Sequence, residues 1–570
     1  MCTLFLLIIA VVSASAGTHA DERRSSDGPI VTISDGKVLG YYDSTPYGNE
    51  FVAFEGIPFA APPIGELRFQ APRRAERWTG VLKAHQTHTC VQNLPQYPGR
   101  DGVTIGDEDC LYINVYTPRL NNSTPLDVIV HIHGGGFLYS EPRQYGPAIL
   151  METGRVVFVN FNYRLGALGF LSTEDETVPG NNGLKDQVMA FEWIKDNVER
   201  FGGDPRSVTI SGISAGSACV HLHYLSPLSK GLFHRGIAAS GTALSPWAIS
   251  ENSAEKTRRL ADMLRCDGAD ASAAVVDCLR TRAAADVVRA ASSLTITPFV
   301  SVFGPVVERV DDGTAFLSAP PYELMHAGKI HDLPIIMSIT QAEGLVPGAF
   351  FLSDDEYLRH VVDDRWYELA PTVLEYEHTV PPEDRDAVSL RIKRFYFKEK
   401  KISPDTFAEF VKMLGDRLFV ADIELTAKLQ ARRNTAPVYF YYLGYRGVYS
   451  KSIVMSGKED DFGVSHSDDG IYILWHEWAT PEHSDDDKKM KRIFQDMWTS
   501  FARNSVPTLD GIVWNPLSRA LDPIHYLHIA APTKISMQAR ESFVDRRFWD
   551  SLPFDENRLP AATADQKEEL

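Results

Sequence analysis

Apolar runs rich in β-branched residues recur at wide intervals along the chain, and they constrain the fold more than any other feature. Because the hydrophobicity of each run is nearly continuous, the runs predict strands buried on both faces of a mostly parallel sheet. The runs occupy residues 127–132, 156–161, 208–211, 333–337 and 437–442.

The segment between the second and third runs predicts a helix. Its apolar residues, among them Leu184, Val188 and Phe191, share one helical face, and two glycines at 202–203 end the pattern. Strand–helix–strand order over hundreds of residues is typical of an α/β protein. The chain begins differently, because an Asp-Gly turn at 35–36 between two short apolar runs predicts a small N-terminal β-hairpin.

No linker, repeat or low-complexity stretch divides residues 28–555, so we expect one domain with inserted helices, followed by an acidic tail at 556–570. The formal net charge of −18 argues against a nucleic-acid partner, because phosphate binding needs clustered Lys and Arg. The charge instead indicates a solvated acidic surface.

The N-terminal residues 1–17 predict a cleaved secretory signal peptide. Leu4–Val12 is apolar, and an A-x-A arrangement of small residues follows it. This stretch is too short to span a bilayer, and no later segment reaches 18 uninterrupted apolar residues, so we expect no membrane span.

The chain ends in a sequence close to KDEL-type retrieval signals: Lys567, Glu568, Glu569 and Leu570. We therefore expect retention in the lumen of the endoplasmic reticulum (ER) through a retrieval receptor, with secretion as the alternative.

Cysteine usage agrees with an oxidising compartment. Five cysteines remain after the signal peptide, and the two local pairings are Cys90–Cys110 and Cys266–Cys278. Cys219 lies in an apolar-leaning run and is predicted to be a buried free thiol. Asn121 begins an Asn-Asn-Ser glycosylation sequon.

The pentapeptide at 212–216 has the form G-x-S-x-G, with Ser214 at its centre. The pattern alone is weak, and its alternative interpretation is a Gly/Ser-rich turn. Its context strengthens it, because a strand at 208–211 precedes Ser214 and a plausible helix begins at Ser217. This order is that of a nucleophile elbow, in which the glycines allow a strained serine to project its hydroxyl.

A glycine-rich loop follows an earlier predicted strand, in the sequence His133-Gly134-Gly135-Gly136-Phe137. Backbone N–H groups in such a loop can bind the anion of a tetrahedral intermediate. Gly135, Gly136 and Ala215 are the predicted donors. His131 and His133 could instead bind a metal ion, but no carboxylate or cysteine nearby completes a site, so none is expected.

The partners of such a serine follow it in the order acid, then histidine. Glu343 comes just after the run at 333–339, where strand-end loops of α/β proteins form sites. His466 lies in a polar loop that leads into an apolar stretch at 471–475. For each, the alternative is a solvated loop residue.

The chain resembles the type-B carboxylesterase/cholinesterase family, and most closely the insect carboxylesterases, over nearly its full length. The elbow signature extends back to Phe201, and a second family signature occupies residues 108–116. Further matching motifs lie at residues 56–60, 68–69, 162–166 and 186–187.

The resemblance implies the α/β-hydrolase fold, with a large, mostly parallel mixed sheet flanked by helices, and a serine carboxylic ester hydrolase without a cofactor. It makes Ser214 the nucleophile, Glu343 the acid and His466 the general base. It also implies the oxyanion donors and both disulfides given above. Ser240 matches a supporting serine, and Trp247 and Phe137 are expected in the substrate pocket.

Two departures from the family pattern bear on the substrate. Ile213 stands before the nucleophile, where many relatives have Glu and juvenile hormone esterases usually have Gln, which indicates altered turnover or substrate preference. Between Cys90 and Cys110 there is no Trp, so the main choline-binding aromatic of cholinesterases is missing and a quaternary-ammonium substrate is not expected.

These observations predict an esterase that acts through an acyl-enzyme on small to medium hydrophobic esters, whether xenobiotic, lipid-like or semiochemical. A juvenile-hormone-type esterase is one alternative. The other is a non-catalytic, neuroligin-like binding protein, but such relatives usually lose a catalytic residue and gain a membrane anchor.

Overall fold

The structure is a computed structural model. It describes residues 28–94, 102–120, 124–266, 271–294, 301–310, 313–352, 356, 358–474, 476, 484–519 and 523–558. The predicted signal peptide, the sequon at Asn121 and the retrieval sequence at 567–570 lie outside these residues.

The described residues form a large mixed sheet whose centre is parallel and whose edges are antiparallel. The seven central strands, β9 to β15, run parallel to one another. β8, β4 and β3 at one edge and β16 at the other are antiparallel to their neighbours. Its eleven strands are, in spatial order, β16 (Lys534–Arg540), β15 (Ile524–Ala531), β14 (Val438–Leu443), β13 (Ile335–Thr340), β12 (Arg235–Ala239), β11 (Gly203–Ile213), β9 (Leu126–Ile132), β10 (Val156–Phe161), β8 (Tyr112–Thr117), β4 (Glu50–Pro58) and β3 (Tyr41–Ser44).

All five predicted runs are strands of this sheet, and β1 (Ile30–Thr32) pairs with β2 (Lys37–Leu39) as the predicted hairpin. Two strands after the run at 437–442 were not predicted from the sequence. β15 and β16 follow it and extend the sheet by two strands. β15 mixes buried with exposed positions and β16 has no buried residue, so both lack the continuous burial that marks the central strands.

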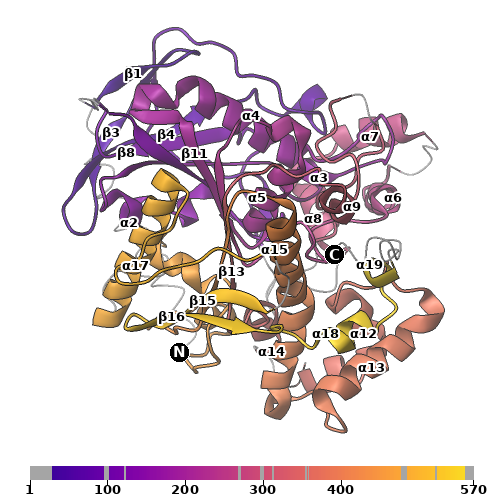
Figure 1. The fold of residues 1–570 in the computed structure, drawn as a ribbon. Helices are drawn as coiled ribbons and strands as arrows, with labels where there is room; N and C mark the ends of the chain where they lie inside the picture. Colours follow the sequence, from indigo (N-terminus) through magenta and orange to yellow (C-terminus); the bar gives the residue numbers. More distant parts are fainter. Residues whose placement is uncertain are drawn as a thin grey trace, which may run out of the picture.

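Helices cover both faces of the sheet (Figure 1). On one face, α4 (Asn182–Asn197) and α5 (Ala215–Leu225) pack on β11. α4 is the helix predicted between the second and third apolar runs. On the other, α17 (Asp485–Asn504) packs on β9 and β11. Alternate residues of β9 enter the two cores: Val128 and Val130 belong to the first, and Ile129 to the second.

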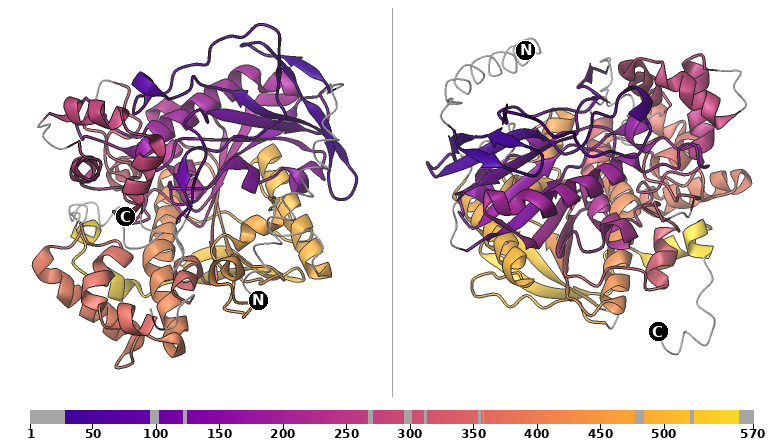
Figure 2. Two further views of the ribbon diagram at one scale, coloured as in Figure 1. Left: turned by 180° about the vertical axis from the view of Figure 1, so that it is seen from behind. Right: turned by 90° about the horizontal axis from the view of Figure 1, so that it is seen from above.

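A long helical segment connects β13 to β14 and gathers in one part of the molecule, away from β3, β4 and β8 (Figures 1 and 2). We call residues 345–433 the helical segment. Its last helix contacts β13 and β14. It comprises α10 (Leu345–Phe351), η5 (Leu358–Asp363), α12 (Trp366–Val373), η6 (Pro382–Asp384), α13 (Arg385–Phe397), η7 (Pro404–Thr406), α14 (Phe407–Gly415), η8 (Asp416–Val420) and α15 (Ala421–Arg433).

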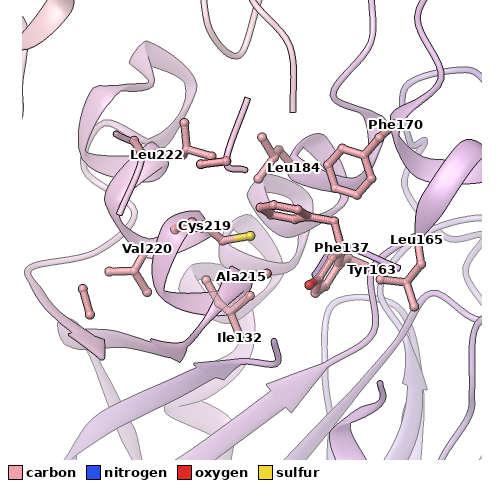
Figure 3. Close-up of a cluster of buried hydrophobic side chains, with 14 of the residues drawn as sticks. Ile132, Phe137, Tyr163, Leu165, Phe170, Leu184, Ala215, Cys219, Val220 and Leu222 are labelled. Atoms are coloured by element: carbon pink, nitrogen blue, oxygen red, sulfur yellow. The ribbon is translucent and has the colours of Figure 1, made fainter. Parts of the chain in front are cut away.

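Both predicted disulfides are present: Cys90 is bonded to Cys110 and Cys266 to Cys278. Cys219 is a free thiol in the same buried cluster as Ala215 (Figure 3), and burial raises its pKa to about 12. No helix in the described ranges is long and apolar enough to cross a membrane.

Candidate active site

The turn between β11 and α5 holds Ser214 in a backbone conformation that residues other than glycine rarely adopt. Its φ is 61° and its ψ is −126°. Its N–H donates to the Ala239 carbonyl at 2.9 Å, and its own carbonyl accepts from Ala218 at 3.0 Å. A strained residue of this kind costs on the order of 1–3 kcal/mol and persists only where its surroundings fix it.

Glycines make this turn possible, because each of three positions has room only for a hydrogen atom. A Cβ on Gly212 would lie 2.2 Å from the Gly216 carbonyl, and one on Gly216 would lie 2.1 Å from the Ile132 carbonyl. A Cβ on Gly241 would lie 2.5 Å from the Ser214 carbonyl. The G-x-S-x-G pattern is therefore a steric requirement of how β11, α5 and β9 meet.

Glu343 and His466 lie in direct contact although they are 123 positions apart in sequence. Nδ1 of His466 is 2.6 Å from Oε2 of Glu343. The other carboxylate oxygen accepts 2.7 Å hydrogen bonds from the Thr340 N–H and from Oγ of Ser240. Glu343 is 1% exposed and His466 is 3% exposed, so water does not weaken this contact.

The loop that carries His466 is held against the strand-end loop that carries Glu343. The N–H of Ala342 donates to the Val464 carbonyl at 2.9 Å. Next to this pair, Asp469 accepts a 2.7 Å hydrogen bond from the Tyr441 hydroxyl. Burial raises the pKa of Asp469, and the negative charge of Glu343 raises it further. The two loops are thus joined close to the contact between Glu343 and His466.

The glycine-rich loop passes directly beside Ser214, and a Cβ on Gly134 would lie 3.2 Å from the Ser214 Cβ. Gly135 and Gly136 have φ values of +97° and +63°, which glycine adopts without strain. Both line the same cavity as Ser214, and Ala215 begins α5 immediately after it. The three predicted N–H donors therefore surround the serine.

His131 and His133 are buried and pack against aromatic rings. His133 lies on Tyr163, with ring centroids 4.4 Å apart, and His131 lies 4.9 Å from the ring of Tyr145. Burial lowers the pKa of both, to about 4 for His133. Within the described ranges, no group of three potential metal-ligating side chains comes together.

A cavity of about 120 Å³ opens at Ser214. Trp247 lines it, donates from Nε1 to the Leu418 carbonyl at 2.7 Å and packs on Phe419. Phe137 differs from the prediction: it is fully buried in the core beside Phe170 (Figure 3) and is not among the residues that line the cavity. It supports Trp247 from behind, at 6.2 Å between ring centroids.

The sequence did not reveal the rest of the cavity wall. These residues share no motif, and they meet only because helices and loops from distant parts of the chain come together at Ser214. They are Tyr139, Ser140, Gln144, Tyr145, Ser301, Val346, Pro347, Phe351, Val373, Glu375, Leu418, Phe419, Lys451, Met455, Ser467 and His476. Ile213 also lines the cavity.

Comparison with known proteins agrees with this geometry. The model of the carboxylesterase family matches residues 27–549. Venom carboxylesterase-6 of Apis mellifera is 38% identical over 93% of this chain and 95% of its own length, and esterase FE4 of Myzus persicae is 39% identical over 91% and 90%. A crystal structure of juvenile hormone esterase from Manduca sexta, with OTFP covalently attached, superposes with a TM-score of 0.80 at 28% identity over 92% of this chain and 99% of the other.

The fold and the comparisons together define an α/β-hydrolase of the serine esterase class. The chain belongs to the carboxylesterase family. It is a carboxylic ester hydrolase.

Proposed function

We propose that the enzyme hydrolyses small to medium hydrophobic carboxylic esters through an acyl-enzyme on Ser214. His466 takes the Ser214 proton as the hydroxyl oxygen attacks the ester carbonyl. Glu343 orients the imidazole and stabilises its protonated form. The 2.6 Å contact between His466 and Glu343, beside a strained Ser214, is the observation that carries this proposal.

The backbone N–H groups of Gly135, Gly136 and Ala215 bind the negative charge that develops on the carbonyl oxygen. One such donor is typically worth about 2.7–4 kcal/mol in the transition state. The alcohol leaves with the proton from His466. A water molecule, activated by the same imidazole, then releases the acid and restores the serine.

The acyl chain lies against an apolar wall of the cavity, which is formed by Trp247, Leu418 and Phe419. The small volume of the cavity and its apolar lining here support a hydrophobic ester of modest size. The intact set of Ser214, Glu343 and His466 argues against a purely adhesive role, and Ile213 argues against a juvenile-hormone-type preference.

Burst kinetics with p-nitrophenyl butyrate test the mechanism. The wild-type enzyme should release one equivalent of p-nitrophenol per protein before the steady state, and Ser214→Ala should release none. Ser217→Ala is the matched control, because this nearby hydroxyl instead donates to the Gly241 carbonyl. A full burst from Ser214→Ala would remove Ser214 from the role.

We also propose that the enzyme enters the secretory pathway through residues 1–17, carries a glycan on Asn121 and is retained in the ER by its last four residues. Two disulfides support an oxidising compartment. Deleting residues 567–570 should send active enzyme into the medium of expressing cells. Unchanged intracellular retention of the deletion variant would contradict retrieval.

A further inference from the structure

His466 lies in a tight turn whose two ends are tied together by a single residue, Asp468. The Asp468 N–H donates to the Ser465 carbonyl at 3.0 Å, and the Ser465 N–H donates to Oδ2 of Asp468 at 2.8 Å. Ser465 directly precedes His466, so both of its backbone polar groups bond to Asp468. Glu343 thus holds the imidazole at one nitrogen, while Asp468 holds the backbone that carries it.

The same turn contains a strained residue. Ser467, which directly follows His466, has a φ of 72° and a ψ of 7°, a left-handed conformation that glycine adopts more readily than serine. Such a residue persists only where its surroundings fix it. The two hydrogen bonds between Ser465 and Asp468 close the turn around Ser467, so they supply this constraint.

The carboxylate of Asp468 also joins the turn to α16 (Lys451–Ser456), a helix with residues on the cavity wall. Oδ1 accepts from the backbone N–H of Lys451 at 2.7 Å, and Oδ2 accepts from Oγ of Ser450 at 2.8 Å. Ser450 is the N-cap of α16, where its hydroxyl oxygen accepts from the Ser452 N–H at 3.2 Å. Asp468 therefore connects the turn of the base to the first residues of this helix.

Three donors converge on this carboxylate in a place that water does not reach. Asp468 is 2% exposed and is not among the residues that line the cavity. Burial raises its pKa to about 7, so at about pH 8.5 the carboxyl is ionised and both oxygens accept hydrogen bonds. Because a buried donor left without a partner is costly, the loss of this carboxylate would force the turn or α16 to move.

We propose that Asp468 is a positioning residue for the reaction: its carboxylate holds the turn at residues 465–468 against α16 and thereby directs the His466 imidazole at Ser214. The inference rests on the proposed function, because it takes His466 as the base. A misplacement of about 1 Å in a reacting geometry can lower a rate by about 100-fold. Substrate binding should not change, because Asp468 does not line the cavity.

Asp468→Asn keeps the size of the side chain and removes one acceptor. The Lys451 N–H donates to one carboxylate oxygen and the Ser465 N–H to the other. An amide has a single acceptor oxygen, so its NH₂ group must face one of these two N–H groups. One of the two backbone anchors is therefore lost whichever way the amide points.

Single-turnover release of p-nitrophenol from p-nitrophenyl butyrate, with enzyme in excess at about pH 8.5, measures the effect. The maximal rate reports attack by Ser214, and the half-saturating enzyme concentration reports substrate binding. The final uptake of a fluorophosphonate counts the active sites. Asp468→Asn should lower the maximal rate per active site by about 100-fold and leave the half-saturating concentration within about twofold. A merely structural residue would lower the number of active sites and leave the rate of each unchanged.

Ser450→Ala separates positioning from charge, because it removes one donor to Oδ2 and keeps the charge of Asp468. We expect its maximal rate to fall about fivefold, since one neutral hydrogen bond is lost. Ser484→Ala is the matched control. Ser484 caps α17 as Ser450 caps α16, but it forms no hydrogen bond with the turn of His466, so its rate should stay within about twofold.

Asp332→Asn is the matched control for the loss of a carboxylate. Asp332 also accepts from two backbone N–H groups and one hydroxyl, those of Thr435 and Ala436, and it precedes β13 at the end opposite Glu343. Its single-turnover rate should equal that of the wild-type enzyme.

A maximal rate of Asp468→Asn within about threefold of the wild-type rate would overturn the role of Asp468. If Asp468→Asn does not fold, equal rates in Ser450→Ala and Ser484→Ala would overturn it instead. A wild-type enzyme that takes up no fluorophosphonate and releases no p-nitrophenol would contradict the proposed function itself. Normal turnover in both the wild-type enzyme and Asp468→Asn would remove only the role of Asp468.

Discussion

The strand-end loops of the sheet and the helical segment form two sides of one cavity by different means. In the strand-end loops, Ser214, Ser240 and Glu343 each follow the carboxyl end of one of three neighbouring parallel strands, β11, β12 and β13. Short hydrogen bonds and glycines without room for a Cβ fix their positions. The helical segment contributes instead mainly apolar side chains such as Leu418, whose positions depend on packing.

The difference separates chemistry from selectivity. Hydrogen bonds and steric exclusion fix atoms to within fractions of an ångström, as a reacting geometry requires. Apolar packing tolerates changes of shape at modest cost, so a wall built this way can be altered while the chemistry persists. We therefore expect changes in the strand-end loops to affect turnover, and changes in the helical segment to affect which ester is turned over.

The largest effect should follow Glu343→Gln, which keeps the shape of the side chain and removes its charge. We expect kcat for p-nitrophenyl butyrate to fall by about 1,000- to 10,000-fold, because the imidazole loses both its orientation and the stabilisation of its protonated form. Asp469→Asn is the control, since this buried carboxyl accepts from Tyr441 and forms no hydrogen bond with His466. If the kcat of Glu343→Gln stayed within tenfold of that of the wild-type enzyme, the strand-end loops would not control turnover.

A second test shortens one side chain of the apolar wall formed by Trp247, Leu418 and Phe419. Leu418→Ala should raise the ratio of kcat/KM for p-nitrophenyl octanoate over butyrate by about tenfold, because one or two methylene groups in an apolar pocket are worth that much. Leu414→Ala is the matched control, since Leu414 is equally apolar and buried but does not line the cavity. Both variants should lose about 2–5 kcal/mol of stability. Equal ratios in the two variants would contradict the role of the helical segment.

Ser240→Ala should have a smaller effect on turnover. It removes one of the two hydrogen bonds to Oε1 of Glu343 and leaves that from Thr340. A loss of roughly 1 kcal/mol corresponds to about a fivefold lower kcat, with KM unchanged. A rise in KM without a fall in kcat would show that Ser240 does not act through Glu343.

The smallest effect concerns stability. His223 lies in α5 behind the elbow, and burial lowers its pKa from 6.5 to about 3. The unfolded chain therefore binds a proton that the folded chain does not, so the stability present above pH 6.5 is lost as the pH falls from 6.5 towards 3.

Urea unfolding at several pH values measures this loss. His223→Gln should make the fall in unfolding free energy shallower by up to about 1.4 kcal/mol per pH unit. A slope unaffected by His223→Gln would show that this histidine is protonated in the fold.

The same contrast explains what could be predicted from the sequence. The central strands are continuous apolar runs, and the elbow and glycine-rich loop need particular residues at particular spacings, so both leave a local signal. Glu343 and His466 were located by their order along the chain and by family resemblance. Lys451 and Leu418 carry no local signal, because they reach the cavity through the packing of helices from distant parts of the chain. β15 and β16 were missed because both contain polar, exposed positions and neither forms a continuous apolar run.

The most direct test of the central claim is the intact mass of the protein after treatment with a fluorophosphonate, which reacts with activated serines. We predict a single adduct that maps to Ser214, no adduct on Ser214→Ala, and labelling that slows sharply in Glu343→Gln. A folded wild-type protein that takes up no adduct, or an adduct that persists in Ser214→Ala, would contradict the account.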